Sequence, residues 1–254
     1  MAKDKSWEQI FKDYKITNHD FSRSPFCLSA EQIKKSCQKF KKTTEKEVRI
    51  LCKQDGRKNR PNIFISNNLF ILPVKNGFYN IIRGEGYIDI PEIKSKVKTY
   101  NSKLSFNLDT SSVGNSEMQH LDFAYASSLI RTFMSDPTLV LTIRGRKYTP
   151  SFDFFVGKQN IKTLSVQTEV DAGYEGKKQV VLIEAKNKST KNTIIRQLYY
   201  PFRQWRTATK KKVVTLFFEK DDKTGIYSIW QFIFKNAKDY NSIKLLKSAR
   251  YIIK

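Results

Sequence analysis

The chain has 254 residues, which is enough to bury a substantial core in one large domain or two smaller ones. Hydrophobic residues make up 39% and aromatic residues 13%, which excludes a disordered chain despite the 28% of charged residues. Lys and Arg number 47 against 24 Asp and Glu, and the resulting net charge of +23 is spread along the chain. This excess favours a polyanionic partner, with nucleic acid first, an anionic membrane surface second and a ribosomal protein-like role as the plain alternative.

No apolar stretch approaches the ~20 residues that a membrane-spanning helix needs, so we expect no contact with the membrane interior. Residues 1–5 lack the apolar segment of a secretory signal, which predicts a cytoplasmic, prokaryotic-type protein. Cys27, Cys37 and Cys52 have no CxxC spacing and are expected to be reduced thiols rather than zinc ligands. Only two histidines are present, which excludes a nuclease site built on paired histidines, and each is predicted to be structural or superficial.

The N-terminal part combines helix and strand patterns. Residues 1–25 have no clear period, whereas Ser29 and Gln32 form a capping box that starts a helix ending near residue 40. A second helix is predicted over about 44–55, followed by β-type runs at 63–65, 69–72 and 78–82. Two helices followed by strands on a basic background are typical of a winged-helix-like DNA reader, and a plain scaffold extension is the alternative.

A polar segment with few apolar residues, 91–114, predicts a connection between two domains. We place the domains at 1–110, the basic N-terminal region, and at 111–254. In the second domain, Ser116 is expected to cap a helix over about 117–134. Strands are predicted at 139–143, 152–156, 164–174 and 180–186, then a helix from 192 or 193 to about 205, then strands at 213–218 and 227–234. This order predicts an α/β (α+β) fold with a mixed central sheet flanked by helices.

The clearest functional pattern is the hydrophobic run 180–186, which ends in Glu184-Ala185-Lys186. Side chains alternate along a strand, so Glu184 and Lys186 share one face. Asp171 lies upstream on the preceding predicted strand, and a tight hairpin would set its carboxylate opposite that of Glu184. Like charges at that spacing repel, and a bound cation such as Mg²⁺, which prefers oxygen ligands, reverses the sign. The pattern therefore predicts a Mg²⁺ site, with Lys186 placed to orient water or to neutralise a phosphate.

Other interpretations of these residues remain open. Glu-x-Lys by itself is a weak pattern in so charged a chain, and residues 92–94 have the same form. Glu169 could form an ordinary surface salt bridge with Lys186 across the hairpin, worth under ~1 kcal/mol. Asp153 is a second candidate for the first acid of the site.

Asp171 followed by Glu184-Ala185-Lys186 after a β-run, with helices on either side, resembles the PD-(D/E)xK nuclease superfamily. Within it the chain is most similar to type II restriction endonucleases, through residues 148–154, 167–175 and 196–201. The resemblance covers about 115–220, and it departs from the family pattern in having Val170 rather than Pro before Asp171. It implies a restriction-endonuclease-like core and Mg²⁺-dependent hydrolysis of DNA phosphodiesters. Asp171 and Glu184 would be metal ligands, and Lys186 the catalytic lysine.

The resemblance also implies two further site residues. Gln197 corresponds to a Gln that related nucleases place on the next helix, although Pro201 stands where they have Tyr, which leaves Tyr200 as an imperfect substitute. Glu117 corresponds to an acid that some relatives use as an extra metal ligand. A first-turn Glu favoured by the helix dipole is the alternative for Glu117.

The expected function is that of a type II restriction enzyme, a homodimer that cuts specific sites in double-stranded DNA and has a cognate DNA methyltransferase. The alternatives are a structure-specific repair, recombination or mobile-element nuclease, and an inactive DNA-binding protein. Basic side chains would supply salt-sensitive affinity for the DNA backbone, although any one of them could simply be solvated. The candidates are Arg144, Arg146, Lys147, Arg196, Arg203, Arg206 and the run at 210–212.

Overall fold

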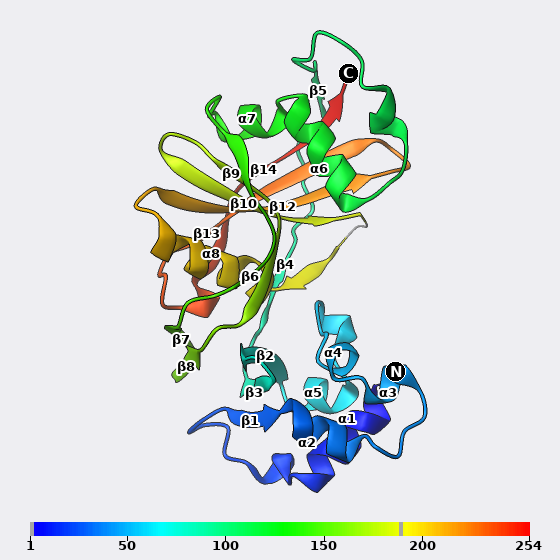
Figure 1. The fold of residues 1–254 in the computed structure, drawn as a ribbon, viewed down its shortest axis with the longest axis vertical. Helices are drawn as coiled ribbons and strands as arrows, with labels where there is room; N and C mark the ends of the chain where they lie inside the picture. The colour runs from blue at the N-terminus through cyan, green and yellow to red at the C-terminus, as the bar shows by residue number, and fades with distance from the viewer. Residues whose placement is uncertain (1–2, 188–189) are drawn as a thin grey trace.

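A computed structural model describes residues 3–187 and 190–254, with a helical N-terminal region below a larger sheet-based region in Figure 1. Residues 1 and 2, part of the segment used above to predict location, lie outside the described residues. The helices are α1 (Asp4–Asp13), α2 (Ala30–Ser36), α3 (Thr43–Lys46), α4 (Val48–Leu51), α5 (Asn62–Ser66), α6 (Glu117–Ala126), α7 (Leu129–Met134) and α8 (Arg196–Ala208). Short 3-10 helices cover Ile16–Asn18, Arg57–Asn59, Asp109–Ser112 and Tyr240–Ser242.

The strands fall into one large sheet and three small ones. Their bounds are β1 (Phe26–Ser29), β2 (Leu69–Lys75), β3 (Phe78–Arg83), β4 (Tyr87–Asp89), β5 (Lys98–Tyr100), β6 (Val140–Tyr148), β7 (Phe152–Val156), β8 (Gln159–Thr163), β9 (Gln167–Glu175), β10 (Gln179–Lys186), β11 (Asn192–Ile194), β12 (Lys212–Asp221), β13 (Ile226–Phe234) and β14 (Ile243–Ile253). The large sheet has the order β5-β14-β13-β12-β10-β9-β6, and it mixes parallel and antiparallel neighbours. The predicted mixed α/β architecture is therefore confirmed.

The N-terminal region has its own core between helices α1, α2, α4 and α5 and the antiparallel sheet β1-β3-β2. The capping box of α2 is confirmed, because the Ser29 hydroxyl accepts the Gln32 N–H and the Gln32 side chain accepts the Ser29 N–H. Trp7 of α1 packs edge-on against Phe64 of α5, with ring centroids 4.7 Å apart. This aromatic contact joins the first helix to the last one of the region.

Local sequence patterns were misleading at several elements. The run at 63–65 forms helix α5 rather than a strand, since a run of three apolar residues does not distinguish the two. The helix predicted over 44–55 is two short helices, because Glu47 between them has extended backbone. Residues 1–25, in which no period was seen, contain α1, whose buried Trp7, Ile10 and Phe11 face the core.

Three further predictions in the second region need correction. The helix at 117–134 is interrupted at Ser128, which has a left-handed φ of 67° and separates α6 from α7. The stretch 164–174 gives only β9, and the β7–β8 hairpin precedes it as a separate sheet. Residues 192–194 form β11 rather than the start of a helix, because they pair with β4.

Helices cover both faces of strand β10, which explains why almost every one of its side chains is buried. Val180 and Leu182 belong to the core under α8. Val181, Ile183 and Ala185 belong to the core under α6 and α7. The predicted alternation along this strand is confirmed. The even-numbered residues lie on the face of the sheet that α8 covers.

The two regions meet beside the end of β10. The Arg57 N–H donates to the Asn192 side chain at 2.7 Å, and the Ile194 N–H donates to the Asp55 carbonyl at 2.8 Å. Strand β4 pairs with β11, and β5 extends the large sheet by pairing with β14. The N-terminal region is thus attached to β11, which begins six residues beyond Lys186.

Cys27, Cys37 and Cys52 are free, as predicted. Across residues 3–187 and 190–254, no helix combines the length and apolar character that crossing a bilayer requires.

Candidate active site

Strands β9 and β10 form the predicted hairpin. The ladder ends with the pair of Ile183 and Ala172, so Glu184 and Asp171 are the residues directly beyond its last pair. The Asp171 Oδ2 atom accepts the backbone N–H of Ala185 at 2.8 Å. The first acid therefore lies against the backbone between Glu184 and Lys186.

A β-bulge at Asp171 turns its side chain. Gly145 pairs with Val170 and Ile143 with Gly173, so Asp171 and Ala172 of β9 face a single residue of β6. Val170 is buried in the core under α8 and Ala172 in the opposite core, so the alternation of β9 shifts between them. Bulges of this kind redirect side chains and occur frequently beside active sites.

Gly173 permits the close approach of β6 at this bulge. A Cβ atom at Gly173 would lie 2.6 Å from the Cβ of Ile143, closer than real Cβ atoms come to any neighbour. The glycine therefore has a steric role two residues from Asp171.

Glu184 and Lys186 form an ion pair on one face of β10. The Lys186 Nζ also donates to the Ala185 carbonyl at 2.9 Å. Glu184 is only 8% exposed. Burial raises the pKa of Glu184 to about 7; the Lys186 ammonium opposes this shift, and the Asp171 carboxylate adds to it. A buried acid with so high a pKa is poorly stabilised as an anion by the protein alone.

Burial and the nearby charges also shift the pKa values of Asp171 and Lys186. Burial raises the pKa of Asp171, although the Ala185 N–H and Lys186 pull it down. Burial lowers the pKa of Lys186, but Glu184, Asp171 and Glu117 outweigh that effect, so its pKa is raised above the ordinary value. The cluster thus holds two carboxylates whose ionisation a further cation would favour.

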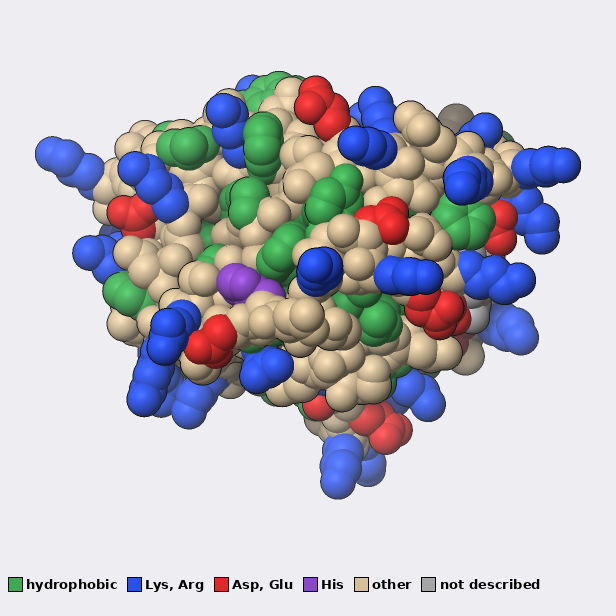
Figure 2. Space-filling model, turned by 90° about the horizontal axis from the view of Figure 1, so that it is seen from below, with side chains coloured by type: hydrophobic (Ala, Val, Ile, Leu, Met, Phe, Trp, Pro, Cys, Tyr) green, Lys and Arg blue, Asp and Glu red, His purple; other side chains and the backbone are tan. Residues whose placement is uncertain are grey.

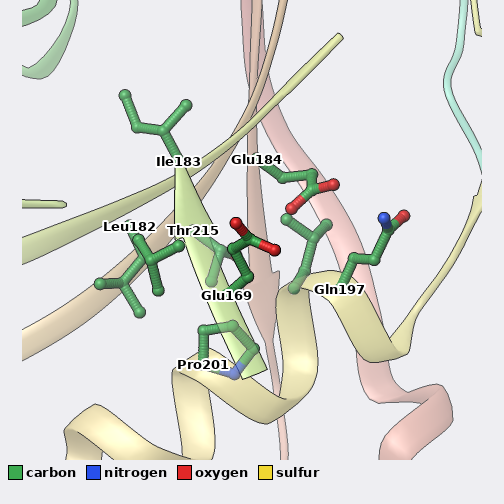
Figure 3. A pocket seen from close by; sticks show the side chains of 9 residues that line it. Glu169, Leu182, Ile183, Glu184, Gln197, Pro201 and Thr215 are labelled. Atoms are coloured by element: carbon green, nitrogen blue, oxygen red, sulfur yellow. The ribbon is translucent and has the colours of Figure 1, made fainter. Parts of the chain in front are cut away.

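A small pocket opens beside Glu184, between β10 and α8. Its lining comes from β9, β10, α8 and β12: Glu169, Val170, Leu182, Ile183, Glu184, Gln197, Leu198, Pro201 and Thr215. Figure 3 shows the carboxylates of Glu169 and Glu184 and the amide of Gln197 around this pocket. The Gln197 Oε1 atom accepts the Thr193 hydroxyl at 2.6 Å, which fixes the amide at its place near Glu184.

Within the described residues, no group of three or more His, Cys, Asp or Glu side chains is placed to hold a metal ion. Glu117 at the start of α6 contributes charge near Lys186 without completing such a group. Asp153 is exposed on the separate β7–β8 hairpin, so Asp171 is the acid beside Glu184. Glu169 pairs with Arg146 at 3.2 Å rather than with Lys186.

His120, one of the two histidines predicted to be structural or superficial, lies in this neighbourhood. It is 3% exposed on α6, and its Nδ1 lies 3.2 Å from the Asn187 Oδ1. The Asn187 amide donates to the Asn115 carbonyl at 2.7 Å, and the His120 Nε2 lies 3.2 Å from an oxygen of Asp222. These contacts attach the residue after Lys186 to the start of α6. No local pattern links positions so far apart in the chain.

The basic residues predicted to bind DNA have different environments. Arg144 pairs with Asp122, and Lys147 is exposed at the end of the edge strand β6. Arg196 is close enough to Glu184 to lower the pKa of that carboxyl. Arg206 is exposed and lies over the Phe202 ring.

Arg203 differs from the other predicted DNA contacts. Its Nη1 donates at 2.9 Å to the Asp153 carbonyl, to the Tyr199 hydroxyl and to the Ala237 carbonyl. Its guanidinium also lies 4.7 Å from the centre of the Phe152 ring. These contacts join α8 to the β7–β8 hairpin, which is a structural task.

Figure 2 shows the face of the N-terminal region, where Lys and Arg side chains project around the whole outline rather than gathering in one patch. Acidic side chains are fewer there, and apolar ones occur singly or in small groups. The positive charge is therefore broad on this face.

Residues 82–252 match a family described as a domain of unknown function, DUF6997, and residues 4–81 match a second domain of unknown function, DUF6996. The two matches meet within β3, whereas the sequence patterns place a boundary near residue 110. No curated protein and no solved structure gives a significant match.

Proposed function

We propose that this chain, which belongs to the DUF6997 family, is a Mg²⁺-dependent DNA endonuclease with its active site at Asp171, Glu184 and Lys186. The observation that carries the proposal is the contact between Asp171 and the Ala185 N–H, which brings a second buried carboxylate and a lysine to the same point. A buried acid beside a second carboxylate is costly without a cation. A DNA phosphodiester carries the negative charge that Lys186 and a bound cation would neutralise.

The topology around this point supports the proposal. In chain order, α6 and α7 precede β6, β9 and β10, which are antiparallel neighbours in the sheet. After them α8 leads to β12, a strand that pairs in parallel with β10. We take this order to support a restriction-endonuclease-like core, with the β7–β8 hairpin as an insertion. Asp171 and Glu184 lie on β9 and β10, the second and third strands of this series.

The donor set fits Mg²⁺, since this ion commonly uses one or two carboxylates and completes its shell with water and phosphate oxygens. Asp171 and Glu184 would hold it, with Glu117 as a more distant acid. When bound, Mg²⁺ would supply Lewis-acid stabilisation of charge on the phosphoryl oxygens.

The residues of the chain have separate tasks in this proposal. Asp171 is held by a backbone donor, so its free oxygen keeps a fixed direction. The Lys186 ammonium, now paired with Glu184, neutralises charge at the scissile phosphate or orients the attacking water. Gln197, held by Thr193, positions groups that enter the pocket beside Glu184.

Double-stranded DNA is the proposed substrate because the net charge of +23 suits a polyanion. Within this class we favour a sequence-specific type II restriction enzyme that acts as a homodimer, with a partner methyltransferase. A repair, recombination or mobile-element nuclease would use the same site.

The test is incubation of unmethylated phage DNA with the purified full chain, with Mg²⁺ or with EDTA, followed by sequencing of the ends. The Glu184→Gln variant is the matched control for a contaminating nuclease. Discrete fragments with a shared end sequence support restriction, and junction- or end-dependent products favour repair. DNA that is bound but left intact in Mg²⁺ would refute the nuclease and leave an inactive DNA-binding protein.

A further inference from the structure

A second cavity lies at the other end of α8 from Gln197. Its volume is about 530 Å³, within the range of small-molecule sites. The lining residues come from the end of α8, the following loop, β12 and β13: Phe202, Arg206, Thr209, Lys210, Lys211, Lys212, Val213, Thr215, Phe232, Ile233 and Phe234. Arg206 lies nine residues beyond Gln197, about 14 Å along the helix axis. Thr215 lines both this cavity and the pocket beside Glu184, but none of the three proposed catalytic residues lines this cavity.

The rim of this cavity is strongly cationic. Arg206 and three consecutive lysines surround it. Lys211 pairs with Glu175. Arg206, Lys210 and Lys212 have no carboxylate within ion-pair distance among the described residues. Three like charges are thus held at one opening without internal compensation, which favours an anionic ligand.

The loop that carries these cations is anchored. The Lys211 N–H donates to the Thr209 hydroxyl at 3.1 Å, and the Lys212 N–H donates to the Lys178 carbonyl at 3.2 Å. The second bond brings the β9–β10 turn, with its own exposed lysines, beside the rim. An anchored loop loses less conformational entropy when it binds a ligand.

The wall behind the cations is aromatic and apolar. The Arg206 guanidinium lies 5.4 Å from the centre of the Phe202 ring, which orients its planar fork. Phe202 stacks on Phe234 with centroids 4.7 Å apart, and Phe234 is half-buried at the cavity wall. A flat ring with a phosphate attached matches this combination of surfaces.

We infer that this cavity binds a nucleotide, with the phosphate at Arg206 and Lys210 and the base against the apolar wall near Phe234. The nucleotide is either free or the 5′-phosphorylated end of a DNA strand, since both present the same groups. This inference is independent of the proposed cleavage reaction, because the site needs neither Asp171 nor Glu184.

The experiment is calorimetric titration of the full chain in EDTA at low salt, so that cleavage plays no part. The probes are deoxyadenosine 5′-monophosphate, deoxyadenosine, deoxyribose 5-phosphate, and one short single-stranded oligonucleotide with and without a 5′-phosphate. Arg206→Gln with Lys210→Gln removes two rim charges from exposed side chains. Lys34→Gln with Lys35→Gln is the control, because it removes two exposed charges from α2.

We expect deoxyadenosine monophosphate to bind more tightly than either of its halves, and the rim variant to weaken it by at least about tenfold while the α2 variant does not. Tighter binding of the 5′-phosphorylated oligonucleotide than of deoxyadenosine monophosphate would identify a strand end as the ligand. Equal or weaker binding would identify the free nucleotide. Equal losses in the two variants, equal affinity for deoxyadenosine and its monophosphate, or no binding of any of these probes would overturn the inference.

Discussion

Asp171 on β9 accepts the backbone N–H of Ala185 on β10 at 2.8 Å. This bond crosses from one strand to the next and ends between the two charged side chains of the Glu-x-Lys pattern. Because a backbone donor moves only with its strand, the first acid is held in place independently of the rotamer of Lys186. The hairpin therefore fixes the relative positions of all three proposed catalytic groups.

Substitution of any of these three groups should abolish cleavage. Asp171→Asn and Glu184→Gln preserve shape but remove a negative ligand, and Lys186→Met removes the cation. We expect each rate to fall by at least about 10²-fold, with DNA binding in EDTA retained. Cleavage by these variants at the rate of the native chain would contradict the assignment. Asn160→Ala, at an exposed position of β8, is the control.

The stability of the native chain should decline with pH in a way that depends on Glu184. The folded pKa is about 7, above the ordinary value of 4.5, so between these values the folded state binds more protons than the unfolded state. The free energy of unfolding therefore falls as pH rises through this window, by up to about 3 kcal/mol from this group. The measurement is urea unfolding in EDTA at pH 5 and pH 8. At pH 8 the free energy of unfolding should be higher for Glu184→Gln than for the native chain. Parallel curves for the two proteins would exclude the effect.

Mg²⁺ should restore the stability that the native chain loses as the pH rises. The ion needs ionised carboxylates, and protonation of Glu184 below about pH 7 competes with it. We expect Mg²⁺ to raise the melting temperature of the native chain more at pH 8 than at pH 5.5. Differential scanning calorimetry with Na⁺ at matched ionic strength gives the baseline. A response of equal size in Glu184→Gln would place the ion elsewhere.

Asn187 should be a positioning residue for Lys186. Asn187→Ala removes contacts with His120 and with the Asn115 carbonyl, and we expect a loss of about 1–2 kcal/mol in the free energy of unfolding. Because the end of β10 is then less restrained, kcat should fall with little change in the KM for DNA. An unchanged kcat in a measurably destabilised variant would limit the role to stability.

Arg203 and Lys147 should separate stability from DNA affinity. Arg203→Ala loses three hydrogen bonds and a ring contact, so we expect a destabilisation of about 2–4 kcal/mol. Lys147→Ala removes an exposed cation and should instead weaken DNA binding. The slope of log K for DNA binding against log[salt] should become less steep by about 1. Measurements of unfolding and of binding at several salt concentrations test both. The reverse pattern would show that these assignments are exchanged.

Several features of the fold follow from local sequence. The hydrophobic run that ends in Glu-x-Lys predicts the strand β10, and the tight hairpin predicted between it and the preceding strand is the one formed with β9. The Ser29 capping box correctly predicts the start of α2. These features are readable because neighbouring residues alone determine alternation, capping and tight turns.

Other features depend on segments far apart in the chain. The bulge that turns Asp171 arises because β6 and β9 pair with unequal numbers of residues, which the sequence of β9 alone does not encode. His120 meets Asn187 only because α6 packs across the end of β10. Residues 192–194, helical in pattern, become a strand because β4 supplies their hydrogen bonds. Composition and alternation therefore determined which acids and which strand make up the candidate site, whereas long-range packing and pairing decided how those acids are oriented.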